Sequence, residues 1–243
     1  MIKHRIQSTS FYSKTLGFDL NYSVYPGDKH HPIIYMLHGA YGNHRDFYTQ
    51  TDLQADLKFL QYPGTIIFVD ALNSYYLNSR HLKMETAIIE DLLPYMEKQY
   101  AFNGQRVIWG ISMGGYGALK LGMKYPELFT TVVSMSPGIW LDPPESSALK
   151  QWDIFKDETR FDLTFWQNEH PLHYLRPLTN HYYLITGQDD HLTDFASVDY
   201  FYQKAKDTLQ IDYTVDPHGP HAWYYWSAIM LRTFLQLQAD QRL

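Results

Sequence analysis

The chain contains no cysteine among its 243 residues. This absence excludes disulfide bonds, metal sites built on thiolates and mechanisms that use a cysteine nucleophile. An enzyme with this sequence must use an oxygen or nitrogen nucleophile instead. Because cysteine-free chains suit a reducing compartment, we expect a cytoplasmic location.

Long apolar segments and long basic segments are also missing. The N-terminal stretch MIKHRIQSTSFYSKTLGF lacks the apolar core of a secretory signal, and no run approaches the roughly 18 apolar residues that cross a bilayer. The formal net charge is −6, and no cluster of lysine and arginine stands out. These features predict a protein that has no membrane segment and no nucleic-acid partner.

The chain does have enough apolar material for one sizeable core. Hydrophobic residues make up 45% of the sequence and aromatic residues 16%, with 21 tyrosines. The length is near the upper size of a single core. We therefore expect one domain over residues 1–243, while the composition specifies no oligomeric state.

Apolar runs typical of buried strands alternate with segments of helical periodicity. The expected strands are 33–37, 65–70, 106–109, 130–134, 182–186 and 211–215, the last nearer an edge. The expected helices are 85–100, 114–124, 195–209 and 223–237. Such alternation predicts an α/β fold with a mostly parallel central sheet and helices on both of its faces.

Two regions depart from this rhythm. Residues 9–25 form two extended segments broken at Leu16-Gly17, which predicts an antiparallel hairpin at the edge of the sheet. Residues 138–180 are rich in proline and aromatic residues and show no strand–helix repeat. We interpret them as an insertion over the strand ends, part helix and part loop. This insertion is either a long connection packed on the domain or a lid-like wall of a pocket.

One serine stands among glycines between an expected strand and an expected helix. The segment Gly110-Ile-Ser112-Met-Gly114 matches the pattern G-x-S-x-G. A sharp turn there lifts the serine hydroxyl above the sheet, and the glycines remove side chains that would clash. The start of the helix supplies unpaired N–H groups that stabilise a developing oxyanion. The pattern therefore predicts Ser112 as a nucleophile.

A serine nucleophile needs a base that is held by a carboxylate. In α/β-hydrolases the chain order is serine, then acid, then histidine. After Ser112, an expected strand ends in Asp189 and Asp190, and a later loop before the last helix contains His218 and His221. Of the two histidines we favour His221, because it lies closer to the start of the helix.

An oxyanion hole needs a second N–H group besides that of Met113, from the loop after an early strand. The expected strand 33–37 ends in His38-Gly39-Ala40. The glycine lets the backbone turn tightly, so that the next amide faces the cleft. The predicted second donor is therefore the amide of Ala40.

Together these segments resemble a known family. The block Gly110-Ile-Ser-Met-Gly-Gly-Tyr-Gly-Ala118, the upstream Leu37-His-Gly-Ala-Tyr-Gly-Asn43 and the downstream His221-Ala-Trp-Tyr-Tyr-Trp226 are similar to the esterase D group of α/β-hydrolases. This group includes tributyrin-esterase-like enzymes, S-formylglutathione hydrolases, feruloyl and acetylxylan esterases and the antigen 85 proteins. The tributyrin-esterase-like branch has the nearest pattern, and the resemblance covers residues 6–234.

The resemblance implies an α/β-hydrolase fold and a set of site residues. It implies Ser112, Asp190 and His221 as the catalytic triad, because in relatives with two adjacent acids the second is generally the triad member. It implies the amides of Met113 and Ala40 as the oxyanion hole. S-formylglutathione hydrolases usually carry a cysteine near the site, which this chain lacks. The residue Asp70 also stands in a segment where relatives often have a proline.

The expected activity is that of a serine carboxylesterase acting on small-molecule esters with short acyl groups, acetylated sugars and feruloyl esters included. The alternatives are another serine acyl enzyme, such as a thioesterase or acyltransferase, and a binding protein on a hydrolase fold. We expect no cofactor and no metal, since His38 has no partner in a metal-binding pattern. Eight aromatic residues are candidates for lining the cleft: Tyr41, Tyr75, Tyr76, Trp140, Trp152, Trp166, Tyr224 and Trp226.

Overall fold

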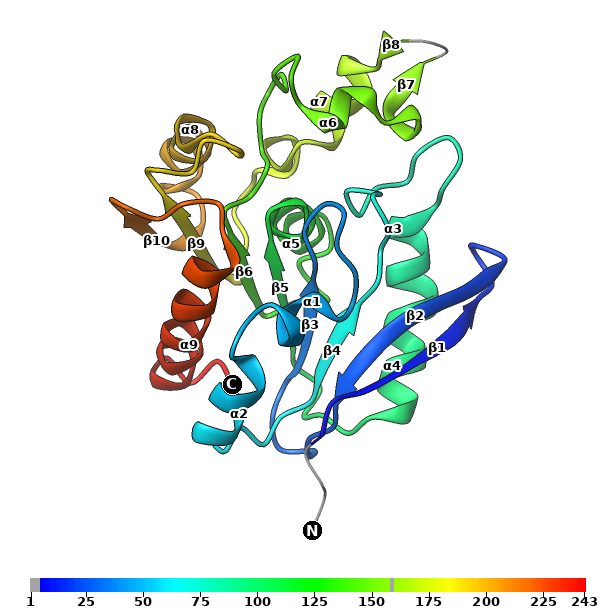
Figure 1. Cartoon of the computed structure of the whole chain (residues 1–243), viewed down its shortest axis with the longest axis vertical. Helices are drawn as coiled ribbons and strands as arrows, with labels where there is room; N and C mark the ends of the chain where they lie inside the picture. The colour runs from blue at the N-terminus through cyan, green and yellow to red at the C-terminus, as the bar shows by residue number, and fades with distance from the viewer. Residues whose placement is uncertain (1–4, 158–159) are drawn as a thin grey trace.

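The computed structural model describes residues 5–157 and 160–243 (Figure 1). Eight strands form one sheet in the order β1-β2-β4-β3-β5-β6-β9-β10. Their bounds are Gln7–Ser13 (β1), Phe18–Tyr25 (β2), Ile33–Leu37 (β3), Ile66–Val69 (β4), Arg106–Ile111 (β5), Thr131–Met135 (β6), His181–Gly187 (β9) and Gln210–Asp216 (β10). From β4 to β10 every neighbouring pair is parallel, which confirms the predicted mostly parallel sheet.

The hairpin predicted at the sheet edge is confirmed. Strand β1 pairs with β2 in antiparallel register from Gln7 opposite Val24 to Ser13 opposite Phe18, and β2 joins β4. Gly17, in the turn between the two strands, has a φ of +77°, a conformation that glycine adopts without strain. Strand β10 closes the opposite edge, where the sequence placed the last strand.

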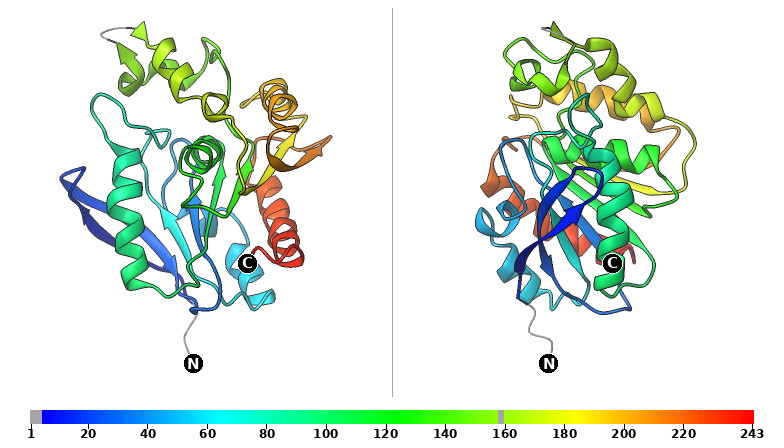
Figure 2. Two further views of the ribbon diagram at one scale, coloured as in Figure 1. Left: turned by 180° about the vertical axis from the view of Figure 1, so that it is seen from behind. Right: turned by 90° about the vertical axis from the view of Figure 1, so that its right-hand side faces the viewer.

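Helices cover both faces of the sheet, as predicted (Figure 2). The bounds of the α-helices in the sheet region are Asp46–Thr49 (α1), Leu53–Phe59 (α2), Met84–Thr86 (α3), Leu93–Gln99 (α4), Met113–Lys124 (α5), Phe195–Ala205 (α8) and Trp223–Ala239 (α9). Alternate residues of β3 point to opposite sides, so Tyr35 belongs to the core with α4, α5 and α8, while Met36 belongs to the core with α2 and α9. The site is therefore built on a sheet that is buried on both faces.

The helix expected at 85–100 has an irregular middle. A π-helical segment, Ala87–Leu92 (η1), joins α3 to α4. Pro94 lies in the first turn of α4 and has no N–H group, so the regular i to i−4 ladder cannot continue through it. The hydrophobic period predicts the helix, whereas the proline accounts for its local change of winding.

Most of the described residues of 138–180, called the inserted segment below, lie beyond the carboxyl ends of the parallel strands (Figures 1 and 2). Its last residues return to the amino end of the sheet, where Asn180 donates to the carbonyl oxygens of Gly122 and Phe129. The inserted segment contains helices Ala148–Gln151 (α6) and Leu163–Glu169 (α7), 3₁₀ turns Asp153–Phe155 (η2) and Pro171–Tyr174 (η3), and the short strands Lys156–Asp157 (β7) and Arg160–Phe161 (β8). The small β7–β8 ladder has no signal in the sequence. The interpretation of this segment as an insertion, either a packed connection or a lid-like wall, stays a prediction.

This segment is docked on α5 by aromatic and polar contacts. The rings of Tyr116 and Trp166 stack with centroids 5.0 Å apart and an interplanar angle of 18°. The Tyr116 hydroxyl donates to the Glu169 carbonyl oxygen at 2.7 Å. The helix that follows Ser112 therefore also holds the inserted segment.

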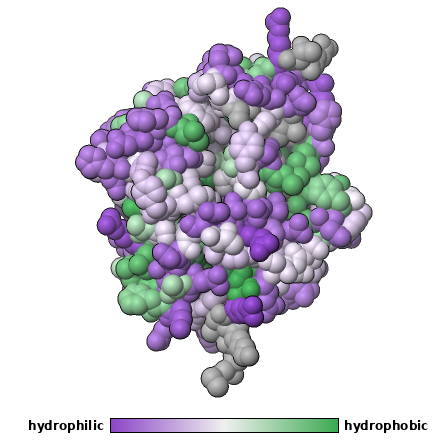
Figure 3. Space-filling view, in the orientation of Figure 1, coloured by the Kyte–Doolittle hydropathy of each residue, from purple (hydrophilic) through white to green (hydrophobic). Residues whose placement is uncertain are grey.

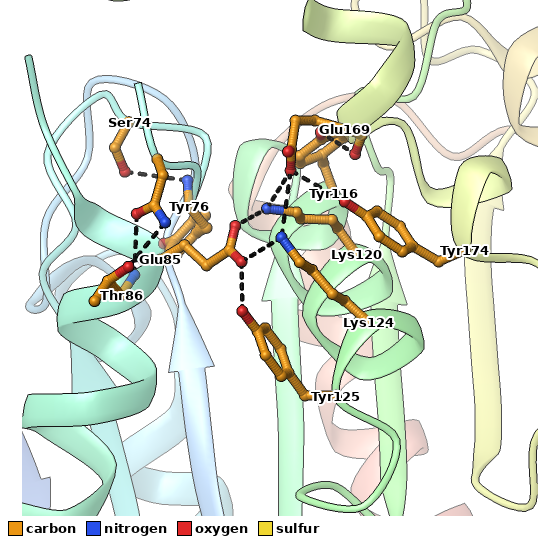
Figure 4. Close-up of polar contacts among 11 residues, drawn as sticks. Ser74, Tyr76, Glu85, Thr86, Tyr116, Lys120, Lys124, Tyr125, Glu169 and Tyr174 are labelled. Carbon is orange, nitrogen blue, oxygen red and sulfur yellow. Dashed lines mark hydrogen bonds and ion pairs between the residues drawn. The ribbon is translucent and has the colours of Figure 1, made fainter. Parts of the chain in front are cut away.

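A cluster of charges lies between α3, α5 and the inserted segment (Figure 4). Lys120 forms ion pairs with Glu85 and with Glu169, the latter at 2.7 Å, and Lys124 pairs with Glu85 at 2.6 Å. The Tyr125 hydroxyl donates to Glu85 at 2.6 Å. Since Lys120 and Glu85 are almost completely buried, we call these four charged residues the buried ion-pair cluster.

The face of the molecule in Figure 3 is mainly hydrophilic, and its apolar residues form separate small patches. Most large apolar side chains instead belong to the two cores that flank the sheet. Among the helices of the described residues, none combines the length and the apolar character that a membrane span requires.

Candidate active site

Ser112 lies at the sharp turn between β5 and α5. Its φ of 58° and ψ of −117° place it in a conformation that costs a non-glycine residue about 1–3 kcal/mol. A Cβ atom on Gly110 would overlap the Gly114 carbonyl, and one on Gly114 would overlap the Leu37 carbonyl. The steric reason for both glycines is thus confirmed.

The structure brings Ser112 together with His221 and Asp190. The distance from Ser112 Oγ to His221 Nε2 is 3.0 Å, and the distance from His221 Nδ1 to Asp190 Oδ2 is 2.7 Å. The three side chains thus form one hydrogen-bonded chain from a hydroxyl through an imidazole to a carboxylate.

The sheet explains how residues so distant in the sequence meet. Strands β9 and β10 are parallel neighbours, with Gly187 opposite Asp216 at their ends. The loops that follow them, which carry Asp190 and His221, therefore start side by side at the edge where β5 delivers Ser112. A Cβ atom on Gly187 would overlap the Gly219 carbonyl, so the first loop has no room for a side chain where the second one passes.

Asp190 is held by more than the histidine. Its Oδ1 atom accepts hydrogen bonds from the backbone N–H groups of Leu192 and Thr193, both at 3.0 Å. Burial acts to raise the pKa of Asp190, but the hydrogen bonds and charge of His221 and the Thr193 amide outweigh it and leave the pKa below its ordinary value. The carboxylate therefore stays ionised at neutral pH and can hold an imidazolium.

The two other candidates, Asp189 and His218, are not part of this hydrogen-bonded chain of side chains. Asp189 is exposed, and its nearest imidazole is that of His218 at 3.6 Å, with 89% of the His218 side chain exposed. Asp190, in contrast, is 1% exposed. The structure thus places His221 against Ser112 and Asp190 against His221, which are the residues selected from the sequence.

Met113 and Ala40, whose amides are the predicted oxyanion hole, both lie near Ser112: Met113 follows it in the chain, and Ala40 lines the same cleft. Met113 is the first residue of α5, where an N–H group has no partner within the helix. Ala40 follows Gly39, and a Cβ on Gly39 would lie 3.4 Å from the Ser112 Cβ. Within residues 5–157 and 160–243, neither amide donates to another group of the protein. Both N–H groups are therefore free of protein partners, as the predicted oxyanion hole requires.

A cleft of about 670 Å³ opens over Ser112 and His221. The sheet loops supply one wall, with Ala40 and Tyr41, and the inserted segment supplies another, with Trp140 and Trp152. The cleft also has a polar side that includes Asp46 and Gln50. A cleft of this size and composition fits a small organic ester.

The aromatic candidates divide into three groups. Five of them line the cleft: Tyr41, Tyr75, Trp140, Trp152 and Trp226. Tyr76 and Trp166 are completely buried outside it, and Tyr224 is 75% exposed on another surface. The sequence identified the aromatic excess, whereas the fold decides which rings reach the cleft.

Two contacts of the site have no clear signal in the sequence. Trp223 lines the cleft beside Trp226, and the Trp226 ring stands edge-on to the His221 imidazole at 4.6 Å and 84°. Thr193 contacts Asp190 through its backbone N–H group, so the type of its side chain does not indicate this role. The position of Trp223 in the string His-Ala-Trp-Tyr-Tyr-Trp is the one available clue.

Within the described part of the chain, no three histidine or acidic residues are arranged to hold a metal ion. His38 uses both ring nitrogens within the protein, with Nδ1 at 2.7 Å from the Gly39 oxygen and Nε2 accepting from the Ala71 amide at 3.0 Å. Its ring has no nitrogen left for a ligand.

Comparisons with known proteins agree with the geometry. A family model described as "Putative esterase" matches residues 13–237. An acetyl esterase of Caldicellulosiruptor saccharolyticus is 26% identical over 111 residues, which are 44% of this chain and 41% of that protein. The aligned part thus spans less than half of that relative.

Solved structures share the fold over nearly the whole chain. A ferulic acid esterase superposes with a TM-score of 0.79 at 22% identity, covering 94% of this chain and 95% of that one. An S-formylglutathione hydrolase from Agrobacterium tumefaciens superposes with a TM-score of 0.77 at 17% identity, covering 95% and 93%. These similarities confirm the α/β-hydrolase fold. Because the family model covers almost all of the described residues, the chain belongs to this esterase family.

Proposed function

We propose that the protein is a serine carboxylesterase that hydrolyses small esters through an acyl-enzyme intermediate. The observation that carries the proposal is the hydrogen-bonded chain Ser112–His221–Asp190, which ends in a cleft beside two amides that have no partner among the described residues. A binding protein needs none of these three side chains in this order, whereas acyl transfer needs all of them.

The first half of the reaction forms the acyl-enzyme. His221 Nε2 takes the proton of Ser112 Oγ as the oxygen attacks the ester carbonyl carbon, and the carbonyl oxygen becomes an oxyanion held by the Met113 and Ala40 amides. Asp190 keeps the proton of the imidazole on Nδ1 and stabilises the imidazolium. The bond to the alcohol then breaks, and the alcohol leaves with the proton from Nε2.

The second half releases the acid. A water molecule gives its proton to His221 Nε2 and attacks the acyl carbon, and the second tetrahedral intermediate uses the same two amides. As the bond to Ser112 breaks, the proton returns from Nε2 to Oγ. The chain's own groups thus balance every proton in both halves.

The cleft supports esters of short or aromatic acids as substrates. Its aromatic walls offer stacking surfaces, and its polar side with Asp46 and Gln50 suits a hydroxylated alcohol such as a sugar. The acetyl and ferulic acid esterases among the similar proteins agree with this choice. A place in the tributyrin-esterase-like branch and a cytoplasmic location stay predictions from the sequence.

The test is hydrolysis of p-nitrophenyl acetate, butyrate and octanoate by the purified protein and by Ser112→Ala. We expect turnover of the short esters by the wild type and a loss of several orders of magnitude in kcat for the variant. Equal activities would overturn the proposal. Competing thiol and alcohol acceptors in the same assay separate hydrolysis from acyl transfer.

A further inference from the structure

The Ala40 amide shares a peptide unit with the Gly39 carbonyl. The structure has no cis peptide bond in its described residues, so this N–H and this C=O point in opposite directions. Whatever holds the Gly39 oxygen therefore decides where the Ala40 N–H points.

Two donors hold the Gly39 oxygen. His38 Nδ1 lies 2.7 Å from it, and the Gly42 amide donates to it at 3.2 Å. The His38 contact is the shorter one, and it comes from a ring with no exposed surface. The Gly42 contact belongs to the same loop and moves with it, whereas the His38 ring is anchored outside the loop.

The far side of the ring defines its tautomer. The Ala71 amide, which can only donate, lies 3.0 Å from His38 Nε2. Nε2 must then accept, so the imidazole is neutral and its proton is on Nδ1, facing the Gly39 oxygen. The Asp70 carboxylate lies 3.7 Å from Nε2, beyond direct hydrogen-bond distance.

The backbone of His38 is fixed as well. The Tyr76 hydroxyl donates to the His38 carbonyl oxygen at 2.9 Å, and Tyr76 is completely buried. Ala71 and Tyr76 both belong to the loop after β4, the next strand in the sheet. That neighbouring loop therefore holds both ends of His38.

We propose that His38 is a positioning residue for the oxyanion hole: its neutral ring donates to the Gly39 oxygen and so turns the Ala40 N–H toward the cleft. This inference rests on the proposed esterase function. His38 takes no part in the proposed proton transfers, which use His221. Orienting the Ala40 amide is therefore a separate role for this buried histidine.

Two polar, neutral substitutions separate the two sides of the ring. In His38→Asn, the side-chain nitrogen takes the place of Nδ1, so the donor to Gly39 stays and the acceptor for Ala71 is lost. In His38→Gln, the longer side chain reaches the place of Nε2, so the acceptor stays and the donor is lost. Both variants remove the imidazole, and only one removes the contact that matters for the Ala40 amide.

Loss of a whole oxyanion-hole donor costs about 10²–10³-fold in kcat, and a misdirected donor costs less. We therefore expect kcat for p-nitrophenyl acetate to fall about 10–100-fold in His38→Gln, with KM nearly unchanged, and to fall less than about 5-fold in His38→Asn. Binding of a trifluoromethyl ketone, which forms a tetrahedral adduct with the serine, should weaken in His38→Gln by the same factor as kcat/KM.

Several results would overturn the inference. A folded His38→Gln with wild-type kcat, or equal losses in both variants, gives His38 only a structural role. A wild type no more active than Ser112→Ala overturns the proposed function and the inference with it. Should neither variant fold, the ¹⁵N chemical shifts of His38 in the wild type still decide: a proton on Nε2 instead of Nδ1 contradicts the proposal.

Discussion

At the start of α5, Ser112 meets His221 and Asp190 through a line of two hydrogen bonds, whereas two turns later Lys120 and Lys124 meet Glu85 and Glu169 in a closed set of ion pairs. The two groups are roughly 12 Å apart along one helix, at 1.5 Å per residue. The same element therefore carries two polar clusters of opposite design.

The difference lies in what each cluster leaves unpaired. Beside Ser112 the Met113 and Ala40 amides have no partner among the described residues, and the cleft reaches the hydroxyl. In the buried ion-pair cluster each carboxylate faces two ammonium groups (Figure 4). The polar groups around Ser112 can therefore bind a substrate, whereas the buried ion-pair cluster can only stabilise the fold.

Among the new substitutions, the largest effect on chemistry should come from the acid of the first cluster. Asp190→Asn removes the charge that holds the imidazolium and permits the wrong tautomer of His221, so kcat should fall about 10³–10⁴-fold. Esterase assays with p-nitrophenyl acetate measure this. Asp189→Asn is the matched control, because Asp189 is exposed and apart from His221, and it should keep wild-type kcat. An equal loss in both variants would contradict the assignment.

The largest effect on stability should come from the second cluster. Glu85→Gln leaves the ammonium of Lys120 buried with one partner fewer, and loss of one partner of a buried pair costs about 3–5 kcal/mol. Urea unfolding followed by tryptophan fluorescence measures the free energy. We expect kcat of the folded variant to stay within about threefold of wild type.

A double variant tests whether the buried charge of Lys120 causes this loss of stability. In Glu85→Gln with Lys120→Met the buried cation is gone, so much of the lost stability should return. If the double variant is as unstable as the sum of the two single variants, the charges are not coupled and the comparison of the two clusters fails.

Acid should loosen both clusters. Burial acts to raise the pKa of Glu85, but Lys120, Lys124 and the Tyr125 hydroxyl outweigh it and leave the pKa below the ordinary 4.5. A carboxyl with a lowered folded pKa stabilises the fold above its ordinary pKa, and this contribution is lost as the pH falls through the folded value. Asp190, also lowered, adds in the same direction.

We therefore expect the free energy of unfolding to fall as the pH drops below about 4.5 and the dependence to be flatter in Glu85→Gln. Urea titrations at a series of pH values between 7 and 3 give both slopes. Equal slopes for the two proteins would show that Glu85 is not the proton-linked group.

Most residues of the candidate site could be predicted from the sequence because the chemistry depends on local patterns. The glycines around Ser112 relieve a strained turn, and the order of acid and histidine follows the order of strands. The buried ion-pair cluster has no such pattern. Glu85, Lys120 and Glu169 lie far apart in the chain, and each alone is typical of an exposed helix face, so only tertiary packing reveals that they meet.

Aromatic residues show the same limit. Trp152 and Trp166 are equally plausible cleft residues in the sequence, yet one lines the cleft and the other stacks on Tyr116. The inserted segment has no periodic pattern that would orient its rings. Local strain and strand order were thus readable, while side-chain direction within an irregular segment was not.

The smallest expected effect concerns the cleft that opens over Ser112. Trp152 comes from the inserted segment, and its indole N–H donates to the Tyr41 hydroxyl at 3.2 Å across the cleft. Trp152→Ala should raise KM for methyl ferulate about 3–10-fold through lost aromatic contact, with kcat nearly unchanged, since one aromatic contact contributes about 0.5–1.5 kcal/mol.

The acyl group provides the internal comparison. KM for methyl acetate should change less than KM for methyl ferulate, because the two esters share their alcohol and an acetyl group has no ring to stack. Tyr224→Ala, at an exposed aromatic outside the cleft, should alter neither value. Equal changes for both esters in Trp152→Ala would mean that the indole shapes the cleft through Tyr41 rather than contacting the acyl group. Substrate binding beside Ser112 would then depend on the shape of the cleft walls, just as the stability of the buried ion-pair cluster depends on its charges.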